Sequence, residues 1–480
     1  MKAYFSIDRA RAGCAVLCVR TVWRRLGAVC ATLWVAGALA SAVQAATPAV
    51  TAASRAQTFQ LANGMTVIVQ PDRRSPTAVQ MLWLRVGVVD ETDRESGVAH
   101  VLEHMMFKGT PTVPEGEFSR RIAGLGGQEN AFTSRDMTAY HVQLPAERLP
   151  EAMRLEADRF AYNTWSDEAF LRERAVVQEE RRQRIEDEPQ SQLYEQFMAM
   201  AWTVHPYRRP VIGWMGRLQT LEPETVRDFY RRWYVPANAA LVVVGDVDPE
   251  QVRRWAQDTF GRLPARAVPP RQTDAEPAQR GPRRLEWRGR TQQPTVLMGW
   301  RVPRLSHPDA DDADARDALA LVLLAGALDG HSAARLERAL VQGQAGERLA
   351  DSVGASYGLA GRGPELFLLS ATPRAGVAVE AVEAALKAEI GRIAREGVTP
   401  AELQRIKNQW MASEVYKLDS TFAQARELGM HWVLGWPLDA GTRLLERLQA
   451  VSADDVQRVA RRYFQDDQLT VGVLRPEGGS

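Results

Sequence analysis

Residues 97–110 read GVAHVLEHMMFKGT, and they place two histidines four positions apart with a glutamate directly before the second. On a helix, positions i, i+3 and i+4 share one face, so His100, Glu103 and His104 point the same way. Two neutral imidazoles at this spacing suit a tetrahedral Zn²⁺, which in a catalytic site takes three protein ligands and one water. Glu103 cannot easily reach the same metal from this turn, but it can accept a proton from that water.

A surface helix with incidental histidines is the alternative explanation of this stretch. A chain of this length and histidine content contains His-x-x-Glu-His by chance on the order of once in a hundred sequences. Here, however, the two histidines alternate with large apolar residues, which predicts a buried helix. Burying imidazoles and a carboxylate without partners is unfavourable, so a bound metal is the better explanation. The apolar residues are Val101, Leu102, Met105, Met106 and Phe107.

The flanking sequence predicts how this helix is placed. Residues 65–71 and 77–91 alternate or run apolar as strands do, and a charged turn joins them. Ser96 is the expected N-cap of the motif helix and Gly109 its expected C-cap. The periodicity predicts longer helices at 116–125, 146–161 and 167–200.

The chain also contains an internal repeat. Residues 223–250 and 453–477 both read as a helix ending in Arg-Arg-aromatic-aromatic, then a short turn, a β-branched strand and Pro-Glu. A Pro- and Arg-rich stretch between the halves reads as an exposed linker. We therefore predict an α+β fold of two duplicated αβ domains, each a mixed, mainly antiparallel sheet covered by helices. The boundaries are 46–264 for the first domain, 265–290 for the linker and 291–480 for the second domain.

The composition excludes several classes of protein. With 480 residues, 45% hydrophobic and 25% charged, the chain has the balance of a soluble protein of two or three domains. Beyond residue 45 the charge is slightly acidic, which gives no electrostatic argument for binding nucleic acid. The predicted mature chain has no cysteine for a disulfide, a metal ligand or a nucleophile. All three cysteines lie before residue 46: Cys14, Cys18 and Cys30.

The first 45 residues read as a targeting segment. Arg24 and Arg25 precede an uncharged apolar run, and small residues at its end offer a cleavage site near Ala45. We predict a signal peptide over residues 1–45 and a periplasmic or secreted protein with no membrane span once the signal is removed. If it is left uncleaved, the same run is long enough to anchor the chain in a membrane.

The motif stretch resembles the zinc helix of the pitrilysin-type metallopeptidases, whose His-x-x-Glu-His order inverts the common zinc peptidase motif. This family includes the mitochondrial processing peptidases and insulin-degrading enzymes. The resemblance continues in GGQENAFTSRDMTAYHVQLP (126–145), RERAVVQEERRQRIEDEP (172–189), HPYRRPVIG (205–213) and WYVPANAALVVVGDVDP (233–249). It covers the first half closely and the second half more loosely.

The resemblance implies the rest of the site. The third ligand of one Zn²⁺ per chain would be Glu180, with Glu173 two helical turns earlier supporting the ligands from outside. Glu179 is the rival ligand, and only the family register rejects it; without that register this Glu/Arg-rich stretch reads as a solvated helix. The family also implies that an extended peptide pairs with a sheet edge at Asn130, Ala131 and Phe132. An ordinary turn and strand is the alternative reading of those three residues.

One family feature is missing from the second half. Active members use an arginine and a tyrosine seven positions apart near the zinc, and residues 334–363 contain no such pair. A chain of this length would also form only half of the family's clamshell. We therefore expect a dimer in which a related non-zinc subunit supplies the pair, or else a homodimer.

Together these features predict an exported zinc metalloendopeptidase that hydrolyses short or unfolded peptides, with Glu103 as the general base. Two alternatives are a subunit of a peptidase that processes one specific precursor, and a non-catalytic scaffold of the same family. The natural substrate, the cleavage preference and the identity of the partner do not follow from the sequence.

Overall fold

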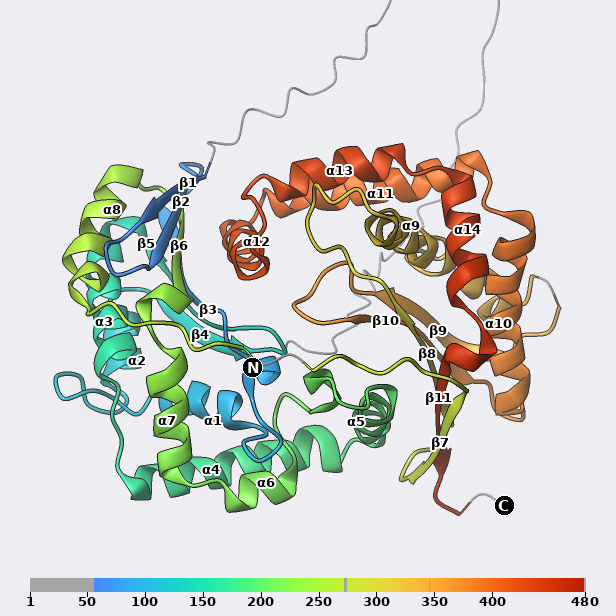
Figure 1. The fold of residues 1–480 in the computed structure, drawn as a ribbon, viewed down its shortest axis with the longest axis horizontal. Helices are drawn as coiled ribbons and strands as arrows, with labels where there is room; N and C mark the ends of the chain where they lie inside the picture. The colour runs from blue at the N-terminus through green and yellow to red at the C-terminus, as the bar shows by residue number, and fades with distance from the viewer. Residues whose placement is uncertain (1–55, 272–273, 345, 479–480) are drawn as a thin grey trace, which may run out of the picture. The chain divides into compact units, whose positions relative to one another are not determined.

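Two sheets organise the part of the chain that the computed structural model describes, residues 56–271, 274–344 and 346–478 (Figure 1). The predicted signal peptide lies outside these residues. Among the helices described, none combines the length and the apolar character that crossing a membrane requires. The first half contains β1 (Gln57–Gln60), β2 (Thr66–Pro71), β3 (Thr77–Leu84), η1 (Val88–Asp90), α1 (Val98–Met105), α2 (Glu117–Gly124), β4 (Gln128–Thr133), β5 (Thr138–Pro145), η2 (Ala146–Arg148), α3 (Leu149–Tyr162), α4 (Asp167–Arg181), η3 (Arg182–Glu186), α5 (Pro189–Ala201), η4 (Pro206–Arg208), α6 (Met215–Thr220), α7 (Pro223–Trp233), η5 (Pro236–Asn238), β6 (Ala239–Gly245), α8 (Pro249–Asp258) and η6 (Phe260–Arg262).

The second half repeats this plan with fewer short turns. Its elements are β7 (Arg283–Gly289), β8 (Thr295–Val302), α9 (Ala313–Leu328), η7 (Glu337–Val341), β9 (Ala350–Tyr357), β10 (Glu365–Pro373), α10 (Val379–Glu396), α11 (Pro400–Lys417), α12 (Thr421–Leu434), α13 (Ala440–Ala450), α14 (Ala453–Tyr463), η8 (Asp466–Gln468) and β11 (Leu469–Pro476). Strand β7 occupies the end of the segment that the sequence predicts as a linker.

The first sheet has the order β1-β2-β6-β3-β5-β4. Strands β2 and β6 are parallel, and the other neighbours are antiparallel. Every residue of β6 is buried, which explains its unbroken apolar sequence, because a central strand covered on both faces has no polar side. Strand β4 lies at the end of this order opposite to β1. Among the described strands it pairs with β5 alone, so it is an edge strand.

The second sheet repeats the order β2-β6-β3-β5-β4 of the first. Its strands run β7-β11-β8-β10-β9, and β7 and β11 form the parallel pair. The two sequence repeats occupy equivalent places, α7 with β6 and α14 with β11. The predicted α+β fold of two mixed sheets, each covered by helices, is confirmed.

The two halves exchange a helix. Helix α12 of the second half packs on the first sheet, where Ala425, Leu428 and Val433 join one buried apolar cluster with Trp83. Helix α5 of the first half packs on the second sheet in the same manner. The approach of α12 is close, since a Cβ on Gly429 would lie 2.0 Å from the Trp83 ring. Because of this exchange, two buried apolar clusters contain residues of both halves.

The prediction of one continuous helix over residues 167–200 was wrong. The structure divides it into α4, the π-helical turn η3 and α5. Pro189 explains the break, because its ring excludes the helical conformation of the preceding residue and Glu188 is extended.

Candidate metal centre

Helix α1 carries the two histidines, and a buried carboxylate holds its N-terminus. The N-cap is Gly97, not the predicted Ser96, which is buried without a side-chain hydrogen bond. Glu91 takes over the capping role, because its two oxygens accept the backbone N–H of Gly97 and of Ala99, each at 3.0 Å. The helix ends at Met105, and its C-cap is Met106 and not the predicted Gly109. This capping by a residue of the preceding loop orients the helix that presents the histidines.

His100, His104 and Glu180 come together where α1 meets α4. Glu180 Oε2 lies 3.3 Å from His104 Nε2 and 3.9 Å from His100 Nε2. One ligand atom from each residue can be chosen so that all three lie within 4.8 Å of one another. Tetrahedral zinc ligands lie about 3.3–3.6 Å apart. Glu180 Oε2 is also buried without a hydrogen-bond partner, so this donor set fits a zinc ion.

One of the two histidines is neutral, and the other carries a proton that would leave when a metal binds. Burial lowers the pKa of His100 to about 3, which keeps the imidazole neutral. Burial acts in the same direction on His104, but the hydrogen bond to Glu173 and the charge of Glu180 outweigh it and raise its pKa to about 9. His104 therefore holds a proton that a cation can replace, because a metal ligand must be deprotonated.

Glu173 supports His104 from the side away from Glu180. Its Oε1 lies 2.8 Å from His104 Nδ1, which leaves Nε2 as the ring nitrogen turned toward the cluster. Lys108 holds the other oxygen of Glu173 at 2.5 Å. The pKa of Glu173 is about 2, because these two cations outweigh the effect of burial. The carboxylate is thus ionised and fixed against the imidazole.

Glu103 lies beside the cluster and is anchored by the sheet edge. Thr133 Oγ1 donates a hydrogen bond to Glu103 Oε2 at 2.5 Å. Burial raises the pKa of Glu103 above its ordinary value, and the Thr133 hydrogen bond partly offsets that rise. A carboxylate with one occupied and one available oxygen can accept a proton next to a metal-activated water.

The predicted peptide-binding residues lie on β4, outside the metal cluster. Asn130 Oδ1 accepts the N–H of Ala131 at 2.8 Å. The Phe132 ring packs edge-on against Trp83 at 5.8 Å between centroids. Their connection to the cluster runs through Thr133, the last residue of the same strand.

The rival ligand Glu179 faces away from the cluster. Its side chain is 55% exposed and pairs with Arg182 at 2.8 Å, whereas the side chain of Glu180 is 8% exposed. Sequence reasoning missed the supporting roles of Lys108, Thr133 and Glu91. Lys108 lies beyond the end of α1, and its position four residues after His104 in the sequence was the available signal.

Two family models and several known proteins are similar to this chain in sequence. Residues 66–214 match the family model "Insulinase (Peptidase family M16)", and residues 220–410 match "Peptidase M16 inactive domain". The zinc protease PqqE of Helicobacter pylori is 29% identical over 433 residues, covering 88% of this chain and 93% of that protein. The mitochondrial-processing peptidase subunit beta of Lentinula edodes is 25% identical over 435 residues, covering 86% of this chain and 88% of that protein.

A solved structure agrees with these matches. The crystal structure of a protease from Helicobacter pylori has a TM-score of 0.82 and 28% sequence identity, covering 88% of this chain and 100% of that one. Two mixed sheets covered by helices are consistent with half of the clamshell expected from the sequence. The match to residues 66–214 spans all three members of the candidate metal cluster. The chain therefore belongs to the pitrilysin-type peptidase family M16.

Proposed function

We propose that the chain is a zinc-dependent metallopeptidase that hydrolyses peptide bonds in short or unfolded peptides. The observation that carries this proposal is the convergence of His100, His104 and Glu180 beside the anchored carboxylate of Glu103. The zinc proteases among its relatives support the same activity.

His100, His104 and Glu180 would hold one Zn²⁺ per chain. When bound, zinc supplies a Lewis acid that polarises a carbonyl and lowers the pKa of water to about 7. Glu173 keeps His104 in the tautomer that binds metal, through the 2.8 Å contact at Nδ1. The chain's own residues therefore supply both the ligands and their orientation.

Glu103 would act as the general base. Because Oε2 accepts the hydrogen bond from Thr133, Oε1 is the oxygen left to take a proton from the attacking water. The raised pKa of Glu103 lets it keep that proton until it passes it to the leaving amine. Glu103 would thus accept a proton when water attacks and donate it when the amine leaves.

The substrate would add as an extended strand along β4. An edge strand directs the backbone groups of alternate residues away from its one neighbour, so a peptide could pair along Asn130, Ala131 and Phe132. Backbone pairing tolerates many side chains. Asn130 would have to release the N–H of Ala131 for this pairing. Short or unfolded peptides fit this mode better than one folded substrate.

Export and a partner subunit complete the proposal. The segment 1–45 has the features of a cleavable signal, which supports a periplasmic or secreted location. The missing Arg and Tyr pair in residues 334–363 supports a dimer with a related non-zinc subunit, or with a second copy. Cell fractionation with N-terminal sequencing of the recovered protein tests the first point, and a native pull-down tests the second.

A subunit of a specific processing peptidase is the second candidate function. The similarity to the mitochondrial-processing peptidase subunit beta favours it. The test is hydrolysis of several unrelated, quenched fluorescent peptides by the chain from residue 46, alone and with any co-purified partner. Cleavage of most peptides supports the general peptidase, whereas cleavage of one precursor alone supports the processing subunit. Absence of zinc and of any cleavage would refute both.

A further inference from the structure

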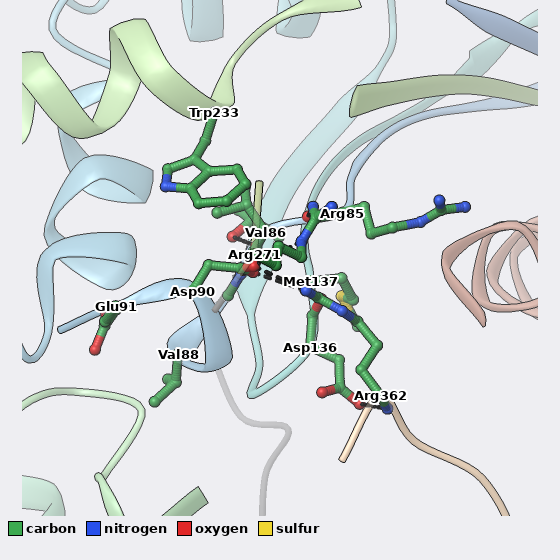
Figure 2. A network of polar contacts seen from close by, with 12 residues as sticks. Arg85, Val86, Val88, Asp90, Glu91, Asp136, Met137, Trp233, Arg271 and Arg362 are labelled. Atoms are coloured by element: carbon green, nitrogen blue, oxygen red, sulfur yellow. Dashed lines mark hydrogen bonds and ion pairs between the residues drawn. The ribbon is translucent and has the colours of Figure 1, made fainter. Parts of the chain in front are cut away.

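Asp90 is a buried carboxylate at which the two halves meet. Its side chain is 1% exposed, and the guanidinium groups of Arg271 and Arg362 converge on it (Figure 2). Arg362 donates from Nη1 and Nη2 to the two carboxylate oxygens at 2.7 and 2.8 Å, and Arg271 donates from Nε at 2.9 Å. A bidentate pair on a buried carboxylate is strong and specific in orientation, so it fixes the segment that carries Arg362.

The loop between β9 and β10 brings Arg362 to the first half. The backbone N–H of Arg362 donates to Asp136 Oδ2 at 3.0 Å, and its Nη1 donates to Asp136 O at 2.8 Å. The N–H of Gly363 donates to Tyr207 Oη at 2.8 Å, and that hydroxyl donates to Asp136 Oδ1. A Cβ on Gly363 would lie 2.4 Å from His205 Cε1, so the close approach requires glycine.

Asp136 belongs to the turn 134–137 that joins β4 to β5. The first half holds this turn from the other side, because Val88 N–H donates to Ser134 O at 3.3 Å and Val89 N–H donates to Arg135 O at 2.9 Å. The turn therefore lies between η1 of the first half and the Arg362 loop of the second half.

The turn follows directly on the residues that matter for the proposed chemistry. Thr133, which holds Glu103, is the last residue of β4 and precedes the turn. Thr138 begins β5 on the other side and donates to Val86 O at 3.0 Å. A shift of the turn would move the end of the edge strand and the hydroxyl that orients the base.

We propose that Arg362 is a positioning residue through which the second half sets the peptide-binding edge β4 and the orientation of Glu103. This inference rests on the proposed peptidase function. Arg362 touches neither the metal cluster nor the edge strand itself, and it acts through Asp90 and Asp136. The second half, whose described residues contribute no member to the metal cluster, thereby contributes to the geometry of the first half.

The test compares Arg362→Ala and Arg362→Lys with a matched control, Arg335→Ala. Arg335 forms an equally short bidentate pair with Glu402, at 2.8 and 2.7 Å, within the second half and away from the turn. The measurements are kcat and KM on a fluorogenic peptide, zinc per chain, and amide hydrogen exchange over residues 128–137. All use the chain from residue 46 with any partner that co-purifies.

Arg362→Ala should lower kcat/KM about tenfold, with a higher KM because the peptide-binding edge shifts and a lower kcat because small misplacements of the base relative to substrate are costly to rate. Zinc content should stay unchanged, exchange over 128–137 should accelerate, and Arg362→Lys should be intermediate. Arg335→Ala should stay within about twofold of wild type, as expected for a pair that is only structural.

Wild-type KM and wild-type exchange over 128–137 in Arg362→Ala would overturn the inference, as would a loss equal to that of Arg335→Ala. If Arg362→Ala does not fold, Arg362→Lys decides by the same criteria. If the wild type cleaves no peptide, the proposed function fails, and the exchange over 128–137 still decides whether Arg362 positions β4.

Discussion

Replacing Glu173 by glutamine should weaken zinc binding while leaving all three proposed ligands in place. In the structure Glu173 Oε1 lies 2.8 Å from His104 Nδ1, and the two side chains are 14% and 19% exposed. The substitution keeps the size of the side chain and removes its charge. It also leaves Lys108 without one of its two carboxylate partners.

The size of the effect follows from this contact. A hydrogen bond to a charged group contributes about 1.5–3 kcal/mol when it is shielded from water. That range corresponds to a roughly 10- to 100-fold change in an equilibrium constant, which is also the usual effect of losing a carboxylate that supports a metal-bound histidine. We therefore expect the zinc dissociation constant of Glu173→Gln to rise about 10- to 100-fold.

Competition with a chromophoric chelator measures this dissociation constant. Two further variants serve as controls, one expected to lose no affinity and one expected to lose more. Glu179→Gln changes an exposed carboxylate on the same helix and should bind zinc as the wild type does. Glu180→Gln removes a proposed ligand and should lose more affinity than Glu173→Gln. An unchanged zinc affinity in Glu173→Gln, or an equal loss in Glu179→Gln, would refute the reasoning.

Three further predictions concern the base, the exchanged helix and pH. Glu103→Gln should retain zinc and lose about 10²–10⁴-fold in peptide hydrolysis, since it removes the proton acceptor; near wild-type turnover would exclude Glu103 as the base. Gly429→Ala should lower the free energy of unfolding by about 1–3 kcal/mol in urea titrations, because the added methyl group would lie 2.0 Å from Trp83; unchanged stability would contradict the close packing of α12. The hydrogen bond from Arg74 lowers the pKa of Asp72 to about 2, with burial opposing it. Its stabilisation is therefore complete above the unfolded pKa of about 4 and is lost as pH falls toward 2. The stability difference between wild type and Asp72→Asn should shrink over that range, and a difference independent of pH would argue against this ion pair.

The sequence predicts local features of the fold well. The spacing of His100, Glu103 and His104 places them on one helix face whatever surrounds the helix, because helical geometry repeats every 3.6 residues. The repeat at the ends of the two halves predicts two equivalent sheets for a similar reason, since each repeat forms one helix and the strand that follows it in the chain. Both features depend on neighbours in the chain.

Features that depend on contacts outside the element itself did not follow from the sequence. The sequence predicts Ser96 as the cap of α1, but the side chain of Glu91, six residues before Gly97, accepts the N–H groups at the start of the helix. The exchange of α5 and α12 between the halves has no signature in either helix, because an apolar face does not indicate which sheet it will cover. The residue pattern shows that a helix has an apolar face, but only the tertiary structure shows which sheet that face covers.

The candidate site shows the same division. By itself the sequence determined two histidines and a glutamate on one helix face, since that arrangement needs only the helix. Glu179 and Glu180 differ by about 100° around α4, and only the crossing of α4 over α1 turns Glu180 toward the histidines. The tertiary structure likewise brings Arg362 to Asp90 across 272 positions of sequence, a contact that exists only because the two halves pack together.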